Sequence, residues 1–330
     1  MKKKLLFVWQ MSGLICCITS LLPAKVRGQS LIFGNEKSKV EVGMNIGPSF
    51  FLGDLGGNRG KGTRFIKDVN LDLTNVMKGV FVSVYPRDWY GIRAAAQFGK
   101  LEAQDEIIET RGVDELWRKQ RNLDFRSDIF EAYIAVEAFP FKFFSYGDYS
   151  RLQPYAVLGV GMLKFNPQGS LTDASGAKTW YYLKPLHIEG QGFEEYPERD
   201  EYSLTQVNIP MGCGVKYEIS ERVNISVELL LRKSFTDYID DVSKTYIDPK
   251  LYDKYLSPQD AIIARKISDK MYGIVTPSVS RYSPGTQRGN ANQNDSYFTT
   301  FLKFGMRLGP IYKDGASRMA VERMRCPVTF

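Results

Sequence analysis

Residues 223–233 read VNISVELLLRK, and apolar and polar side chains alternate along this run with a period of two. One face would hold Val223, Ile225, Val227, Leu229 and Leu231, and the other Asn224, Ser226, Glu228 and Arg232, with Leu230 as the exception. Successive side chains of a β-strand point to opposite faces, so this run predicts a strand with one apolar and one polar surface. A length of about ten residues is typical of a strand that crosses a membrane in a closed barrel.

The same alternation recurs at seven other places in the chain. It is regular in 207–218 and 298–308, and less regular in 40–47, 76–85, 90–101, 129–139 and 154–165. In 76–85, Lys78 falls on the apolar face. After residue 28, no apolar run approaches the roughly 20 residues of a membrane-spanning helix. The predicted fold class is therefore all-β, an eight-stranded antiparallel transmembrane β-barrel.

The connections between these strands alternate in length. The turns at 86–89 and 219–222 are tight and the connection at 140–153 is short, whereas long loops lie near 48–75, 102–124, 166–203 and 234–296. Outer-membrane barrels with an even number of strands have short periplasmic turns, long external loops and both termini in the periplasm. We therefore predict an outer-membrane barrel over residues 29–308. In a soluble β-sandwich, long and short loops are not expected to alternate in this way.

Residues 1–28 have the pattern of an export signal. Lys2, Lys3 and Lys4 precede an apolar core at 14–22, which is short for a membrane span. The residues before Gln29 suit a signal peptidase, so we expect cleavage after residue 28 and export to the outer membrane. The alternative is an uncleaved signal anchor.

Two cysteines remain after such a cleavage, Cys213 and Cys326. An oxidising compartment would permit a disulfide between them. Because one lies in a predicted strand and the other in the tail, we expect two free thiols.

The overall charge and the single histidine exclude several kinds of function. The chain has 44 Lys and Arg against 37 Asp and Glu, but removing residues 1–28 leaves 39 against 37, which argues against nucleic-acid binding by bulk charge. His187 is the single histidine, so multi-histidine metal sites are excluded. The motifs of serine hydrolases, zinc proteases and P-loop enzymes are absent. We expect a non-enzymatic protein without cofactor or metal; the alternative is an enzyme that uses His187 at the external rim.

If the apolar face contacts lipid, the opposite face lines the lumen. We expect an ion-pair network there, formed by Glu41, Arg93, Glu131, Glu137, Lys216, Glu228, Arg232, Lys303 and Arg307. An eight-stranded barrel has an interior that side chains can fill, and charges in such a space must be paired. A plugged barrel is the favoured interpretation, and a narrow or gated pore is the alternative.

The longest loop contains a helix signal. Ser257 is an expected N-cap with Pro258 at the first helical position and Asp260 three residues on, followed by an apolar stripe of Ile263, Ile267 and Met271. We expect this helix to pack over the barrel mouth, and a partner's groove is the alternative. A second loop carries an acidic run, which lacks the ligand spacing of an EF-hand and predicts a solvated loop rather than a calcium site: Glu194, Glu195, Glu198, Asp200 and Glu201.

Aromatic residues cluster at the short connections. Tyr85, Trp89 and Tyr90 bracket one turn, and six more rings crowd the connection after 129–139 (Phe139, Phe141, Phe143, Phe144, Tyr146 and Tyr149). Aromatic girdles mark the membrane interfaces of barrels, so we expect these rings to face the lipid headgroups.

The tail at 309–330 follows the last predicted strand and would lie in the periplasm. Its residues 317–325 could form a short helix that exposes Arg318, Arg323 and Arg325 as a docking site for a partner. An untethered terminal segment is the alternative.

Four segments resemble a known family. They are IGPSFFLGDL at 46–55, PYAVLGVG at 154–161 with Asn166-Pro167 after it, IPMGCGVK at 209–216 and, most specific of all, FTDYIDDVS at 235–243. The chain resembles, over roughly residues 38–308, the outer-membrane β-barrel family that includes the type IX secretion component PorG.

This resemblance implies a non-enzymatic anchor or assembly component of a type IX-like protein secretion system. The implied partners are outer-membrane lipid and periplasmic ring components of that apparatus. The family offers no catalytic residues to carry over. The alternative is a small pore or surface-binding barrel unrelated to secretion.

Overall fold

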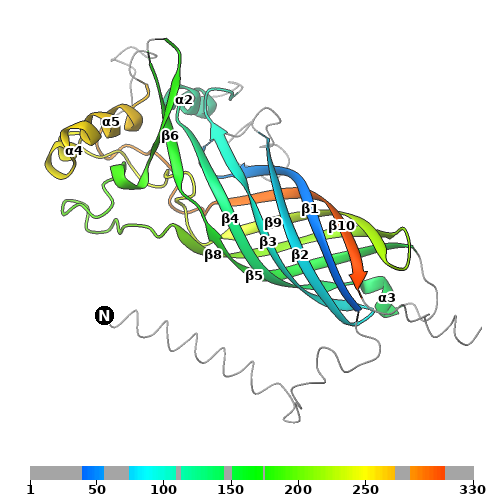
Figure 1. The fold of residues 1–330 in the computed structure, drawn as a ribbon. Helices are drawn as coiled ribbons and strands as arrows, with labels where there is room; N and C mark the ends of the chain where they lie inside the picture. Colours follow the sequence, from blue (N-terminus) through cyan, green and yellow to red (C-terminus); the bar gives the residue numbers. More distant parts are fainter. Residues whose placement is uncertain are drawn as a thin grey trace, which may run out of the picture.

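The computed structural model describes residues 39–55, 74–108, 113–144, 151–173, 175–271 and 283–308. Eight antiparallel strands close into a barrel, which confirms the predicted fold class (Figure 1). In chain order they are β1 (Lys39–Leu52), β2 (Asn75–Arg87), β3 (Tyr90–Gln104), β4 (Asp124–Ala138), β5 (Leu152–Lys164), β8 (Thr205–Glu218), β9 (Val223–Ser234) and β10 (Ser296–Leu308). The expected signal peptide, the tail and Cys326 lie outside the described residues.

The first and last strands close the barrel. β1 pairs with β10 from Val40↔Leu308 to Leu52↔Ser296, and β3 pairs with β4 along its whole length. Every strand of the wall thus has two neighbours, and the wall has no open edge. Within the described residues, no helix is long and apolar enough to cross a lipid bilayer.

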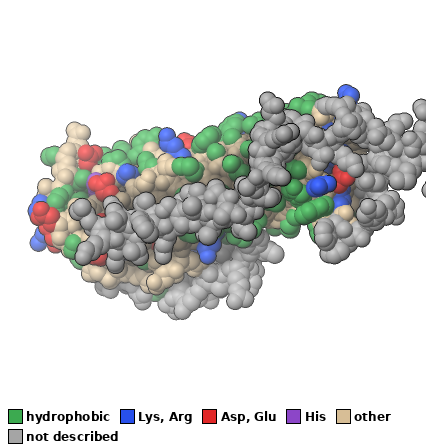
Figure 2. Space-filling view, turned by 90° about the horizontal axis from the view of Figure 1, so that it is seen from below, with side chains coloured by type: hydrophobic (Ala, Val, Ile, Leu, Met, Phe, Trp, Pro, Cys, Tyr) green, Lys and Arg blue, Asp and Glu red, His purple; other side chains and the backbone are tan. Residues whose placement is uncertain are grey.

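Buried and exposed residues alternate along each barrel strand, with apolar side chains outside. In β4, Ile134 and Val136 are 60% and 50% exposed, whereas Glu131 and Glu137 are fully buried inside. Figure 2 shows hydrophobic side chains over much of the described outer surface. Lys78 also lies on this outer face, where its ammonium lies 5.1 Å from the centre of the Phe98 ring. The barrel therefore has apolar side chains on its outer surface and charged side chains inside, the reverse of a soluble protein.

Two of the turn-flanking rings do not face outward. Tyr85 and Phe139 are 6% and 3% exposed, and their rings pack edge to face inside the barrel with centroids 5.9 Å apart. The expectation of an interfacial girdle is wrong for this pair. Trp89 and Phe141, by contrast, are 42% and 63% exposed.

The strands reach further at the end with the long loops than the alternation predicts. β1 continues to Leu52 and β4 begins at Asp124, so parts of the predicted loops 48–75 and 102–124 are strand. A helix, α2 (Val113–Arg121), lies between β3 and β4.

The predicted loop 166–203 contains a hairpin that the sequence pattern does not predict. Its strands are β6 (Pro167–Thr172) and β7 (Lys178–Tyr182), and β6 pairs with the start of β4 through Arg126↔Gln168. Strands of six and five residues are too short to give a clear period of two.

The hairpin and the helices of the longest loop form a second core outside the barrel, which we call the external cap. It comprises β6, β7, the 3-10 turn η2 (Lys184–Leu186), α4 (Lys250–Tyr255) and α5 (Pro258–Ser268). Its apolar centre contains Leu183, Leu186, Ile188, Phe193, Ile247, Tyr252, Ala261, Ala264 and Ile267. The Ser257 hydroxyl accepts a hydrogen bond from the Asp260 amide at 3.2 Å, which is the predicted N-cap. The apolar face of α5 thus packs within its own chain.

Candidate functional site

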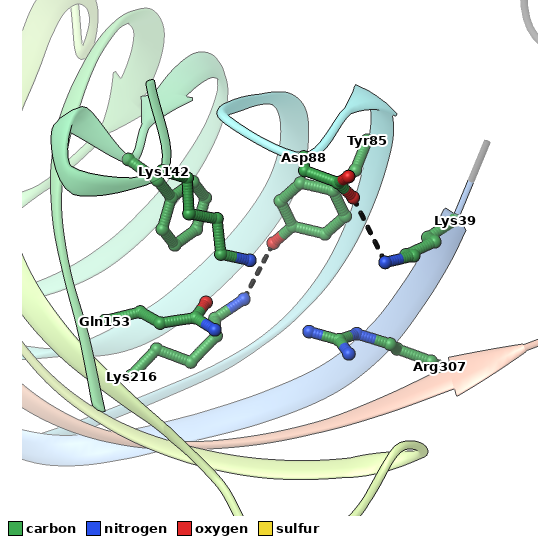
Figure 3. A pocket seen from close by; sticks show the side chains of 8 residues that line it. Lys39, Tyr85, Asp88, Lys142, Gln153, Lys216 and Arg307 are labelled. Atoms are coloured by element: carbon green, nitrogen blue, oxygen red, sulfur yellow. Dashed lines mark hydrogen bonds and ion pairs between the residues drawn. The ribbon is translucent and has the colours of Figure 1, made fainter. Parts of the chain in front are cut away.

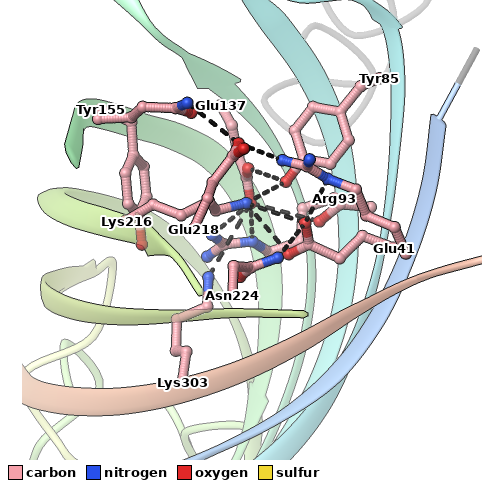
Figure 4. Close-up of polar contacts among 12 residues, drawn as sticks. Glu41, Tyr85, Arg93, Glu137, Tyr155, Lys216, Glu218, Asn224 and Lys303 are labelled. Atoms are coloured by element: carbon pink, nitrogen blue, oxygen red, sulfur yellow. Dashed lines mark hydrogen bonds and ion pairs between the residues drawn. The ribbon is translucent and has the colours of Figure 1, made fainter. Parts of the chain in front are cut away.

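The lumen holds a continuous network of charged groups, and Figure 4 shows part of it. At the end with the short turns, Lys216 Nζ lies 3.1 Å from both carboxylate oxygens of Glu41 and 2.8 Å from the Tyr85 hydroxyl. Asn224 donates a hydrogen bond of 2.9 Å to the same carboxylate. The Glu41 carboxylate therefore has three donor contacts in this layer.

The middle layer is centred on Arg93. Its guanidinium donates to Glu137 and, at 2.9 Å, to Glu228. Glu228 also contacts Lys303 Nζ at 3.0 Å and accepts a hydrogen bond of 2.7 Å from the Tyr155 hydroxyl. A Cβ at Gly214 would lie 2.7 Å from the Tyr155 hydroxyl, so this position must stay small for the contact to form.

The third layer joins Arg232 to Glu131. The Arg232 Nε lies 3.1 Å from Glu131 Oε2, and its other nitrogens donate to Gln97 and the Thr299 hydroxyl. Asn208 donates to Glu131 Oε1 at 2.6 Å.

The structure places all nine proposed network residues on the inner face, eight of them fully buried or nearly so. Arg307, the ninth, lies nearer the mouth, with 16% of its side chain exposed, and pairs with Glu218. Glu218 was not among the proposed residues, although it lies on the polar face of its strand. Counting it, the inner face of the described wall strands carries five acids and five bases, namely Glu41, Glu131, Glu137, Glu218 and Glu228 with Arg93, Lys216, Arg232, Lys303 and Arg307.

The end of the barrel with the short turns is nearly closed. The cavity there has a volume of about 10 Å³, enough for about one water molecule, and Figure 3 shows the side chains that line it. Lys142, from α3 (Pro140–Phe144), reaches into this mouth, and burial lowers the pKa of its amine to about 8. Phe139 and Tyr85 pack beneath it. Side chains therefore seal this end.

A wider cleft of about 540 Å³ opens at the end with the long loops, between the ends of β3 and β4, the β6 strand and α5. Asp124 lies against it and accepts hydrogen bonds from the backbone and hydroxyl of Ser170 and from Lys270. Three lysines and three carboxylates line it, so the cleft is polar and nearly balanced in charge.

Buried polar contacts tie the external cap to the barrel rim. Glu189 accepts hydrogen bonds of 2.9 Å from Arg288 Nη1 and from the amides of Ser243 and Lys244. Arg121 donates to Asp105 at 2.7 Å and to the backbone oxygen of Arg288 at 2.6 Å. These two arginines connect α2, the β9–β10 loop and the cap.

A group of aspartates lies buried beneath this connection. Burial raises the pKa of Asp237 to about 8 and that of Asp241 to about 7, and nearby carboxylates contribute in both cases. The pKa values of Asp240 and Asp295 are raised well above the ordinary range, first by burial and then by neighbouring carboxylates. Among the described residues, no group of three or more His, Cys, Asp or Glu side chains could hold a metal ion.

These raised pKa values predict a pH-dependent cap. A carboxyl group whose pKa is higher in the folded state stabilises the fold at low pH, and that contribution is lost as the pH rises through the folded pKa. We expect limited proteolysis to cut the cap several-fold faster at pH 9 than at pH 6. Asp237→Asn should reduce this ratio, whereas Asp128→Asn, at a side chain that is 82% exposed, should leave it unchanged. An unchanged ratio in Asp237→Asn would contradict the assignment.

The remaining candidates take ordinary structural positions. The His187 Nδ1 lies 2.6 Å from the Gln191 carbonyl oxygen, and the ring packs against Phe193. In the acidic run, Glu195 pairs with Lys254 at 2.7 Å at the surface. Arg318, Arg323 and Arg325 lie outside the described residues.

No model of a known protein family matches this chain. No curated protein matches it either. Solved structures with a similar backbone include a major outer membrane protein from Thermus thermophilus, with 11% identity and a TM-score of 0.37 over 83% of this chain and 100% of that one. OprG from Pseudomonas aeruginosa has 12% identity and a TM-score of 0.30 over 83% and 96% of the two chains. Ail of Yersinia pestis, solved with the heparin analogue sucrose octasulfate, has 8% identity and a TM-score of 0.30 over 82% and 97%.

The barrel is established by the strand pairings of this chain itself.

Proposed function

We propose that this chain is a non-conducting outer-membrane anchor or assembly component of a type IX-like protein secretion system. The observation that carries the non-conducting role is the lumen, where five acids and five bases form ion pairs in successive layers. The four sequence segments that resemble the family of PorG support the secretion role.

The outer surface supports a location in a membrane. Leu158, Val160 and Ile134 are 60%, 63% and 60% exposed and lie side by side on β5 and β4. An apolar surface that surrounds a barrel would be an aggregation site in water, but it matches the lipid-facing band of a transmembrane barrel. We propose the outer membrane because closed antiparallel barrels with short turns at one end are typical of it.

A charged residue in this band should prevent stable insertion. Leu158 lies in the middle of β5, so Leu158→Arg is expected to lower the free energy of unfolding in lipid by about 2–4 kcal/mol. Urea titration in lipid vesicles measures this change. Leu158→Met is the matched control and should cost less than about 1.5 kcal/mol. Equal stability of the arginine variant would place this face in water.

The anchor role is tested by extracting outer membranes gently, with the protein tagged in an external loop, and identifying what copurifies. Periplasmic ring and secretion-channel components should be recovered with the full chain and lost after deletion of residues 309–330. The deleted protein should still fold, as shown by heat-dependent migration on gels. If the full chain is recovered alone, the secretion role fails and an autonomous surface-binding barrel takes its place.

The pore is the alternative that the lumen disfavours. Planar bilayers that contain the purified barrel should show no steady conductance above that of the lipid alone. Stepwise conductance that disappears on Arg232→Ala or Glu131→Ala would overturn the non-conducting role. The external cleft of about 540 Å³ favours surface binding as a second function, since its volume is in the range of ligand pockets.

A further inference from the structure

The sheet continues past the barrel wall and ends in an open edge. β6 pairs with β4 on one side and with β7 on the other, and β7 is the last strand in this direction among the described residues. The barrel wall itself has no such edge. The far side of β7 is therefore the place where the described sheet could accept a further strand.

The register shows which backbone groups face this edge. The Leu183 amide donates to the Pro167 oxygen at 2.9 Å, and the Asp173 amide donates to the Ala177 oxygen at 3.0 Å. In an antiparallel ladder, bonded and non-bonded pairs alternate, so Thr179 and Tyr181 are the residues of β7 that bond to β6. The alternate residues point their N–H and C=O groups outward; they are Lys178, Trp180 and Tyr182.

No other described group hydrogen-bonds to these three outward backbone positions. Tyr182 is 52% exposed, and Lys178 and Thr179 are also exposed. Unpaired N–H and C=O groups at a repeat of two residues are what an added β-strand recognises. The edge is therefore accessible at both ends of β7, with Trp180 and Tyr181 half-buried between them.

The side chains around the edge are aromatic and basic. The Arg126 guanidinium stacks on the Trp180 ring at 4.2 Å, and Lys184 follows two residues after Tyr182. Arg126 donates to Gln168, and neither Arg126 nor Lys184 has a carboxylate partner among the described residues. Lys178 lies 3.9 Å from Asp124 and 4.0 Å from Glu106, so these two carboxylates compensate its charge. The positive charge beside the edge that favours an acidic partner is therefore that of Arg126 and Lys184.

We propose that the open edge of β7 is a docking strand that binds an extended acidic peptide segment of another protein by β-strand addition. A second copy of this chain would bring two basic edges together, which like-charge repulsion disfavours. A lipid surface would use the charges and rings but not the row of backbone donors and acceptors. The proposal depends on the cap lying outside the membrane, but not on the secretion role.

The test uses the full chain in detergent micelles and a fluorescent seven-residue peptide of alternating valine and threonine with a glutamate at each end. We expect saturable binding by fluorescence anisotropy. Trp180→Pro should weaken binding at least tenfold, because proline removes an outward N–H that the hairpin does not use. Trp180→Phe is the matched control, which keeps the backbone donor and an aromatic ring, and should stay within about threefold of the wild type.

Tyr182→Pro repeats the test at the next outward position, in case the first proline variant disrupts the cap. The same peptide with N-methyl groups on alternate amides should bind at least tenfold more weakly, and so should one with lysine at each end. Equal binding to both proline variants would overturn the proposal. If the protein binds anionic lipid vesicles but not the peptide, the partner of this edge is a lipid surface. If it forms dimers that Trp180→Pro dissociates, the partner is a second copy of this chain.

Discussion

Glu228→Ala is expected to lower the free energy of unfolding of the barrel by about 3–5 kcal/mol. The reason is the position of this carboxylate in the middle layer, where it lies 2.9 Å from Arg93 Nη1 and 3.0 Å from Lys303 Nζ at full burial. Removing it leaves the buried Lys303 ammonium with the Glu137 carboxylate at 4.0 Å as its remaining ion pair, and it takes one of two carboxylates from the Arg93 guanidinium. Equilibrium unfolding in urea, followed by tryptophan fluorescence in lipid vesicles, measures the change.

Two controls separate charge from packing. Glu221→Ala removes an exposed carboxylate from the β8–β9 turn and should change stability by less than about 0.5 kcal/mol. Adding Lys303→Met to Glu228→Gln removes one charge of each sign. The double variant should therefore be more stable than Glu228→Gln alone. If Glu228→Ala costs less than about 1 kcal/mol, the lumen is hydrated and the network does not act as a plug.

Arg288→Ala is expected to open the external cap while the barrel stays folded. This guanidinium is 3% exposed and joins Glu189 to the backbone oxygen of Asp241. Its removal therefore leaves the buried Glu189 carboxylate without its positively charged partner. A loss of about 3 kcal/mol in the cap corresponds to an increase of roughly 100-fold in its cleavage by protease. The cleavage rate is measured on intact barrels, with heat-dependent gel migration as the report on the wall.

Arg265→Ala provides the matched control in the same cap. Its ion pair with Asp253 has a distance of 2.7 Å, but the two side chains are 42% and 62% exposed, so the pair contributes little. A cleavage rate near the wild type is expected. If both arginine variants open the cap equally, the buried connection through Arg288 has no special role.

The barrel could be predicted because each wall strand carries its own period of two. The same parity places Tyr85 and Phe139 inside, in phase with Phe81 and Glu137, although their position beside turns had suggested the interface. The alternation of positions along a strand therefore predicts whether a side chain faces inward or outward better than its distance from a turn does.

The external cap could not be predicted in this way. Arg288 and Glu189 are separated by 99 positions in the chain and lie in segments without regular alternation. The β6–β7 hairpin depends on pairing with the start of β4, a tertiary contact that no local pattern of short strands reveals. Only α5, with its N-cap and proline at the first turn, carried a local signal strong enough to be predicted.

The pairing of Val40 with Leu308 has a consequence for how this chain can be connected. Because the first and last strands are neighbours, the two ends of the barrel emerge side by side. A circular permutant that joins these ends and opens the chain at the 219–222 turn would keep every hydrogen-bonded strand pair of the wall. For the same reason, whatever is fused to either end of the barrel is tethered to one small patch on one side of the membrane.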